Sequence, residues 1–149
     1  MFKFAAMESG RPPASSTSAV PGADRNRAGR RALVVESDPD TRQLVQEILT
    51  GLGFIVDAVD NGVDAVSTAR QRPPEVILVA LQLRDVGGLE VLRWLRANSG
   101  LKRVPVIAVG VNEYDLARVR HAQIRAVLRK PLSSSAIVEA IEAAMSVSG

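Results

Sequence analysis

The 149-residue chain lacks cysteine and has a single histidine, His121. Without cysteine, the chain has neither a disulfide framework nor a thiolate metal site, and secretion gains no support. A single imidazole cannot build a zinc site by itself. The sequence therefore predicts no structural zinc centre.

Long apolar runs are also missing. In the opening segment MFKFAAMESG, Lys3 and Glu8 interrupt the few apolar residues, so the segment is too short for a signal-peptide core or a membrane span. We therefore expect a cytoplasmic protein without membrane contact. With 46% hydrophobic and 23% charged residues, the chain is long enough for one globular domain with a sizeable core.

The excess of positive charge lies in the first 31 residues. Residues 1–31 carry six basic and two acidic groups, whereas residues 32–149 carry 13 basic and 14 acidic groups. The segment is rich in Pro, Ser, Gly and Ala and has almost nothing to bury, so we expect residues 1–31 to be a disordered basic tail. Its arginines could contact nucleic-acid phosphates or an acidic partner. A solvated extension, or a true start at Met7, is the simpler interpretation.

From Ala32 onward, strand and helix patterns alternate. The first helix should begin at Pro39, with Asp38 as its N-cap, and end at Gly51 or Gly53. The expected strands are 32–35, 54–59, 75–81, 104–111 and 124–130, and the further helices are 60–72, 87–98, 113–123 and 133–145. Strands that are apolar on both faces and are joined by helices predict an α/β fold, a doubly wound five-stranded parallel sheet over residues 32–149.

Ligand and catalytic sites of such sheets form at the carboxyl ends of the strands. The residues at or just beyond the carboxyl ends of the first, third, fourth and fifth strands are Glu36, Ser37, Asp38, Ala80, Gly110, Lys130 and Pro131. The third strand, VILVA, thus ends on a methyl group rather than on a polar side chain.

These segments make the chain similar to the receiver domain of bacterial response regulators. The resemblance covers residues 31–146 and rests on the VVESDPDTR, GGLEVLRWLR, PVIAV and RKP segments at their usual spacings. It implies a flavodoxin-like fold that accepts a phosphoryl group from a histidine kinase on an aspartate at the end of the third strand. In that family two acids after the first strand hold Mg²⁺, and a Ser or Thr and a Lys complete the site.

Most of that site is missing here. Ala80 stands where the resemblance places the phosphorylated aspartate, and Ser37 replaces the acid that contacts the metal. Gly110 replaces the hydroxyl residue and Val127 the aromatic residue of the fifth strand. The degenerate site positions are therefore Glu36, Ser37, Ala80, Gly110, Val127 and Lys130, of which Glu36 and Lys130 keep the family's chemistry.

Charge predicts the consequence. The charges of Glu36 and Lys130 would roughly cancel. The site would then attract Mg²⁺ too weakly to displace the water molecules bound to the ion. We expect no catalytic residue, no metal and no cofactor. Lys130 should instead form an ion pair with Glu36 at the rim of the sheet, worth 0–1 kcal/mol if it is exposed.

Other charged or aromatic residues offer alternatives. Asp85 could serve as a displaced phosphoacceptor, although a solvated loop aspartate is the simpler interpretation. Trp94 should face solvent and could anchor a partner, or it packs against a neighbour. A basic surface on the fourth helix and fifth strand, which is either an interaction face or merely solvated, comprises Arg118, Arg120, Arg125 and Arg129.

We interpret the chain as a stand-alone pseudo-receiver, a phosphorylation-independent protein-interaction module in bacterial two-component or phosphorelay signalling and not an enzyme. Because no output domain follows Gly149, we expect a protein partner in trans, such as a histidine kinase or another regulator, and homodimerisation stays open. One alternative is an active receiver phosphorylated on a substitute carboxylate. Another, less favoured, is a nucleic-acid-associated protein that binds through its basic tail.

Overall fold

The computed structural model describes residues 29–112 and 124–146, together with Asp115 and Ala117. The expected tail therefore lies outside the described residues up to residue 28, as does most of the helix expected at 113–123. Among the residues of the predicted basic surface, Arg118 and Arg120 also lie outside them.

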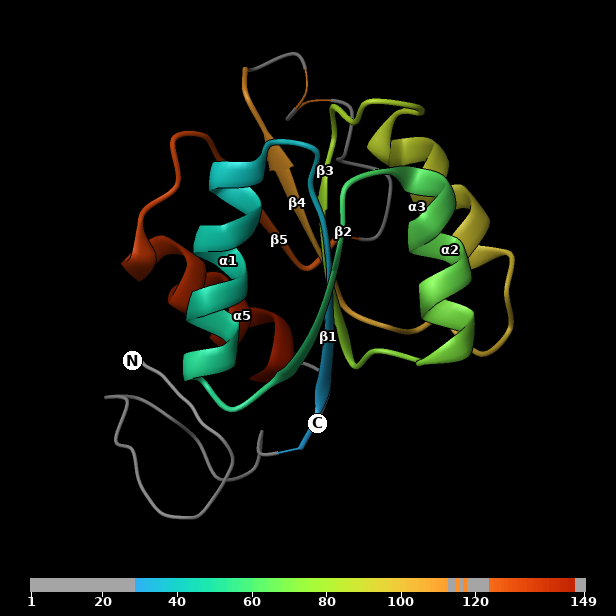
Figure 1. Ribbon diagram of the computed structural model, residues 1–149, viewed down its shortest axis with the longest axis horizontal. Coiled ribbons are helices and arrows are strands. Elements are labelled where there is room, and N and C mark those ends of the chain that lie inside the picture. Colours follow the sequence, from blue (N-terminus) through green and yellow to red (C-terminus); the bar gives the residue numbers. More distant parts are fainter. Residues whose placement is uncertain (1–28, 113–114, 116, 118–123, 147–149) are drawn as a thin grey trace.

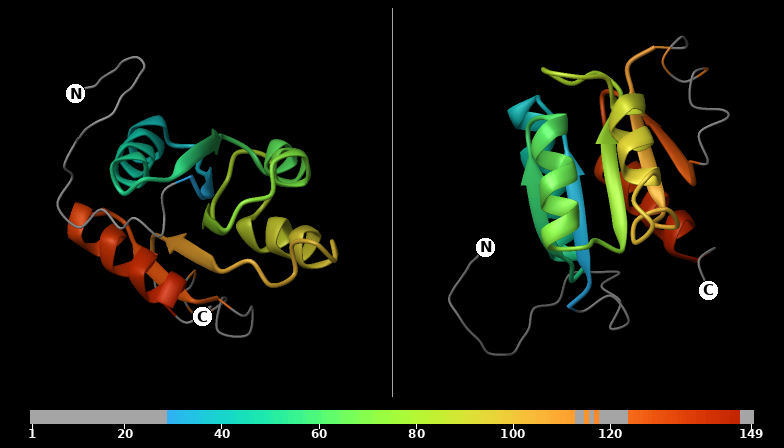
Figure 2. Two further views of the ribbon diagram at one scale, coloured as in Figure 1. Left: turned by 90° about the horizontal axis from the view of Figure 1, so that it is seen from below. Right: turned by 90° about the vertical axis from the view of Figure 1, so that its right-hand side faces the viewer.

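Five strands form one parallel sheet in the order β2-β1-β3-β4-β5. They are β1 (Arg31–Val35), β2 (Ile55–Val59), β3 (Val76–Ala80), β4 (Val106–Gly110) and β5 (Ala126–Arg129). The helices of the described part are α1 (Pro39–Gly51), α2 (Gly62–Gln71), α3 (Gly88–Arg96) and α5 (Ser134–Ser146). Helices α1 and α5 cover one face of the sheet and α2 and α3 the other (Figures 1 and 2). The predicted doubly wound, flavodoxin-like sheet is confirmed.

The strand sequences explain why both faces are covered. Strands β3 and β4 are buried at every position. In β1, Ala32 and Val34 pack with α1 and α5, whereas Leu33 and Val35 pack with α2 and α3. Side chains alternate between the faces of a strand, so a continuous apolar run needs an apolar layer on each side.

The start of α1 agrees with the sequence prediction. Asp38 accepts a hydrogen bond from the backbone N–H of Thr41 at 2.9 Å, and Pro39 occupies the first helical position. The helix ends at Gly51, and Gly53 follows with φ of +102°. A residue without Cβ is favoured at such a φ, so this glycine ends the helix and redirects the chain into β2.

The folded part begins slightly earlier than expected. Arg31 lies in β1 opposite Ile55 of β2, and its guanidinium lies 3.3 Å from the Asp57 carboxylate. The Arg30 carbonyl accepts the N–H of Ile55 at 2.8 Å. Pairing with β2 thus includes Arg30 and Arg31, two residues that the sequence assigned to the tail.

The first turn of α3 packs closely on the end of β3. A Cβ atom at Gly88 would overlap the carbonyl oxygen of Ala80 and lie 2.8 Å from the Cα of Leu81. Gly87, by contrast, has Leu81 O at 3.9 Å as its nearest neighbour. Both of the close atoms are backbone atoms and cannot rotate away, so only glycine fits at Gly88.

We predict that Gly88→Ala lowers the free energy of unfolding by about 2 kcal/mol, because overlap with backbone outweighs the gain in helix propensity. Gly87→Ala is the matched control and should change stability by less than about 0.5 kcal/mol, since that site has room. Urea denaturation followed by circular dichroism measures both. Equal midpoints for the two variants would contradict the packing described here.

Candidate functional site at the carboxyl edge of the sheet

Glu36, directly after β1, is a buried carboxylate. Its side chain is 1% exposed, and its Oε1 lies 3.0 Å from Nζ of Lys130, whose side chain is 25% exposed. The other oxygen, Oε2, accepts the backbone N–H of Asp38 at 3.0 Å. No described residue donates a well-aligned hydrogen bond to Oε1, so the Lys130 ammonium alone compensates that oxygen. The predicted ion pair is present at the rim of the sheet, but Glu36 is buried, so the small energy given for an exposed pair does not apply to it.

The ion pair spans two intervening strands. In the sheet order, β3 and β4 lie between β1 and β5, a separation of about 14 Å between the outer two strands. The intervening strands end in Ala80 and Gly110, and both residues are buried. Ala80 contributes only a methyl group and Gly110 has no side chain. The ends of β3 and β4 therefore place no larger side chain between Lys130 and Glu36.

Ser37 joins three loops by hydrogen bonds. Its hydroxyl donates to the carbonyl of Asp60, after β2, at 2.7 Å and accepts the N–H of Arg84, after β3, at 2.9 Å. The guanidinium of Arg84 also lies 3.7 Å from the Asp60 carboxylate. Ser37 therefore uses its hydroxyl as both donor and acceptor within the protein.

Arg42 is a site residue that the sequence analysis missed. From the first turn of α1, its Nη1 donates to the carbonyls of Glu36 at 2.9 Å and Ser37 at 3.3 Å. A cation at a helix N-terminus opposes the helix dipole, and this anomaly could have flagged the residue. Arg42 fixes the loop that carries Glu36.

The remaining acids of the edge are also engaged. The hydrogen bonds from the hydroxyl and N–H of Thr41 hold the pKa of Asp38 below its usual value, and the nearby Lys130 and Arg42 add to this effect. The amide of Asn61 chiefly lowers the pKa of Asp60, with smaller contributions from Arg84 and Arg42. Both carboxylates are therefore ionised at neutral pH.

The donor set does not suit Mg²⁺, which needs several oxygen ligands free to enter an octahedral shell. Glu36 is occupied by Lys130 and the Asp38 N–H, and Ser37 by two protein partners. Within the described ranges no group of three or more His, Cys, Asp or Glu side chains could hold a metal ion. The side chains of this edge therefore do not fit a magnesium ion.

Asp85 is an exposed loop aspartate, as the sequence suggested, but its carboxylate also accepts hydrogen bonds from the backbone. Its Oδ1 accepts the N–H groups of Gly62 and Val86 at 2.8 Å each, and its Oδ2 accepts the N–H of Val63 at 3.1 Å. These bonds, above all the one from Gly62, lower the pKa of the Asp85 carboxyl. Gly62 and Val63 open α2, so Asp85 caps that helix from the loop before α3. Backbone N–H groups at a helix start attract an anion, which a one-dimensional pattern cannot reveal.

A second missed contact ties the loops after β3 and β4. Asp115 is buried and its Oδ2 accepts the Gln82 side-chain N–H at 3.1 Å and the Val111 N–H at 3.2 Å. The N–H of Asp115 donates to Oδ1 of Asn112. The segment after β4 is thereby attached to the end of β3.

The predicted surface residues have different environments. Trp94 is 36% exposed, as expected for a residue on the outer side of α3. Arg125, just before β5, donates to the carbonyl of Ala144 in α5, so it does more than form a solvated surface. Arg129 is exposed at the opposite end of β5, and Val127 is exposed between them.

The sheet order and the polar edge define a flavodoxin-like domain of the receiver class. Residues 32–142 match the model of the response regulator receiver domain, and the chain belongs to that family, the receiver domain of two-component signalling. No described helix is long and apolar enough to cross a membrane.

Individual relatives agree with this assignment. The chain is 31% identical over 115 residues to the polar-differentiation response regulator DivK of Brucella anthropi. The matched region covers 76% of this chain and 94% of DivK. The receiver domain of sensor histidine kinase PA1611 from Pseudomonas aeruginosa PAO1, solved with a magnesium ion in its active-site cleft, is 27% identical with a TM-score of 0.73, covering 80% of this chain and 99% of that one. A CheY-like receiver domain from Methylobacillus flagellatus is also 27% identical with a TM-score of 0.70, covering 77% and 98%.

We predict that Lys130→Met lowers the free energy of unfolding by about 2 kcal/mol at neutral pH, because it leaves the Glu36 carboxylate buried and uncompensated. Adding Glu36→Gln should recover most of that loss, since a neutral amide needs no counter-ion. Chemical denaturation of the two single variants and the double variant measures this coupling. Additive losses in the double variant would exclude a dependence of Glu36 on Lys130.

We predict that Asp85→Ala lowers stability by about 1 kcal/mol at pH 7, the usual cost of losing a helix cap. Because the folded-state pKa of Asp85 is lowered, its contribution is fully present above the unfolded-state pKa and is lost as the pH falls through the folded-state pKa. The gap between wild type and variant should therefore close in acid. Asp40→Ala, in the first turn of α1, is the control and should show a small gap. A gap for Asp85→Ala that does not shrink as the pH is lowered from 7 until the fold is lost would contradict the capping role.

Proposed function

We propose that this receiver domain acts as a phosphorylation-independent protein-interaction module in two-component signalling. One observation carries the proposal: β3 ends on Ala80, a residue that is 2% exposed and whose backbone carbonyl lies against the first turn of α3. A methyl group cannot attack a phosphoryl donor. The position to which the family resemblance assigns the phosphoacceptor therefore has no nucleophile.

The charges around this position support the proposal. The family resemblance places a lysine after the fifth strand in the phosphorylation site, and here that residue, Lys130, pairs with Glu36. Ser37 links the loops after β2 and β3 by neutral hydrogen bonds. The loops are thus held by contacts within the protein, without a role for metal or phosphate.

Asp85 is a poor substitute acceptor. Both of its oxygens accept backbone N–H groups at the start of α2, so attack on a donor would break the cap of that helix. These bonds weigh against the alternative of an active receiver that uses this carboxylate.

The contacts after β4 support constitutive behaviour. A conformational equilibrium shifts only if the signal makes different contacts in its two states. Gly110 has no side chain to be drawn toward a phosphoryl group, and Val127 is β-branched and stiff. Asp115 further attaches the segment after β4 to Gln82. We therefore expect a partner to bind constitutively, with control by protein abundance or competition.

We predict that the protein gains no phosphoryl group when incubated with acetyl phosphate and Mg²⁺. Intact-mass spectrometry measures this, with an ordinary receiver domain labelled in parallel as the positive control. A mass increase of one phosphoryl group that Asp85→Asn abolishes would establish the substitute-acceptor alternative instead.

The same assay on Ala80→Asp separates loss of the nucleophile from loss of the whole site. The new carboxylate would enter a buried position beside Glu36, with Lys130 as the shared cation and no Ser37 acid or Gly110 hydroxyl to assist. We expect little labelling of this variant and more after Ser37→Asp and Gly110→Thr are added. Efficient labelling of the single variant would show that the remaining residues suffice.

A further inference from the structure

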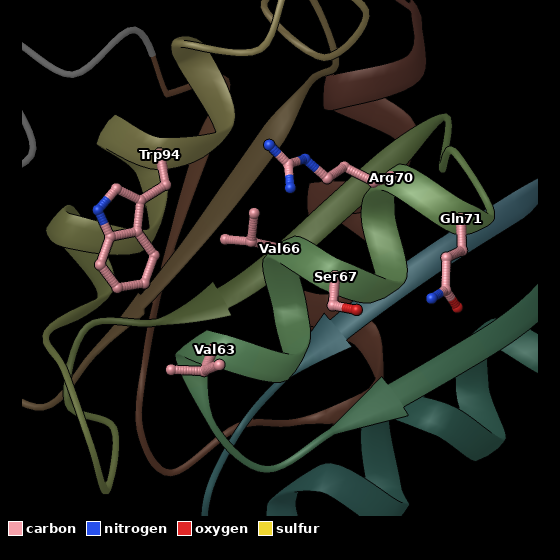
Figure 3. A pocket seen from close by; sticks show the side chains of 6 residues that line it. All are labelled: Val63, Val66, Ser67, Arg70, Gln71 and Trp94. Carbon is pink, nitrogen blue, oxygen red and sulfur yellow. The ribbon is translucent and has the colours of Figure 1, made fainter.

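An open groove of about 460 Å³ lies between α2 and α3 on the face of the sheet opposite α1 and α5. Figure 3 shows the side chains that line it, Val63, Val66, Ser67, Arg70, Gln71 and Trp94. Val63 is 60% exposed, and Trp94 is the single tryptophan of the chain. The groove thus exposes an aliphatic and an aromatic side chain, the kind of residues that anchor protein partners.

The charge of the groove is one-sided. Figure 3 shows the guanidinium of Arg70 extending past Val66 in the direction of Trp94. The residues that line the groove include no acidic side chain. Nearby arginines are already compensated, since Arg93 pairs with Glu90 at 2.7 Å and Arg72 with Asp57 at 3.0 Å. Within the described part of the chain, Arg70 has no hydrogen-bond or ion-pair partner.

The walls of the groove are held rigidly. Asp85 fixes the first N–H groups of α2, including that of Val63, to the loop before α3. A Cβ at Gly62 would overlap Val86 and lie 2.7 Å from Val91 Cγ2, so α2 packs directly on α3 at this end. A preformed site binds its partner without a large ordering cost.

We propose that this groove is a docking site for an amphipathic helix of a partner protein. The helix would place a large apolar side chain against Val63 and Trp94 and an Asp or Glu, three or four residues away, on Arg70. That spacing puts both side chains on one face of a helix. The proposal rests on the proposed function in that it names a surface of the interaction module. It does not depend on the loss of phosphoryl transfer.

A second copy of this chain fits the groove less well. In a two-fold symmetric contact the same patch meets itself, so two Arg70 guanidinium groups would face each other without an acid between them. The apolar side chains of α5 pack against the core: Ile137 and Ile141 are buried, and Val138 and Met145 are partly buried. This helix therefore offers another copy no large apolar side chain that is fully exposed.

The test uses the full chain as bait for a display library of helical peptides of about four turns with randomised outer positions. We expect the selected peptides to share a large apolar residue and an Asp or Glu three or four positions away. Binding of a selected peptide should change the fluorescence of Trp94, a reporter that lies within the groove. Arg70→Glu should weaken this binding about tenfold, as expected for loss of a charge-assisted contact.

Charge reversal provides the sharpest control. Changing the acid of the selected peptide to Lys should restore binding to Arg70→Glu, whereas Arg103→Glu, remote from the groove, should leave the original peptide's affinity unchanged. Absence of enriched peptides, enrichment without an acid, or binding insensitive to Arg70→Glu would overturn the proposal. Dimerisation of the free chain in sedimentation, abolished by Val63→Asp, would assign the groove to a second copy and also overturn it. Phosphoryl labelling of the chain would refute the proposed function while leaving peptide docking intact.

Discussion

The contact between Lys130 and Glu36 determines the character of the carboxyl edge of this sheet. It joins the residue after β1 to the residue after β5, across the ends of β3 and β4, which lie between these two strands. A buried carboxylate is tolerated only with compensation, and here a protein cation provides it. Once Lys130 is committed to Glu36, the edge holds neither a surplus of negative charge to attract a divalent cation nor a free ammonium.

The residues around this pair are compatible with it. Ala80 and Gly110 leave the strand ends between the two charged groups free of large side chains, and Ser37 binds the neighbouring loops with its hydroxyl. Arg42 holds the carbonyls beside Glu36. The family relatives share the framework, and one of them was solved with magnesium at its active-site cleft. The same strand ends can therefore carry either a metal-dependent site or, in our proposal, a rigid edge that leaves function to the outer surfaces.

Rigidity at the edge also reaches the helical face where we place the docking groove. Asp85 belongs to the loop beside the edge and caps α2. The second residue of that helix, Val63, lines the groove. A receiver that moves this loop on activation would disturb that cap. The proposed loss of switching and the proposed docking of a helix between α2 and α3 are thus compatible in physical terms.

The sequence alone determined the strands, the described helices, the order of layers and the identity of the residues at the strand ends, because apolar periodicity and capping residues are local properties. The opposite charges of Lys130 and Glu36, at strand ends that the family resemblance brings together, also predicted their ion pair. The tertiary structure decided the rest. The burial of Glu36, the capping of α2 by Asp85 and the contact of Asp115 with Gln82 join residues from separate loops. Such distances depend on how the loops meet above the sheet, and no local pattern encodes them.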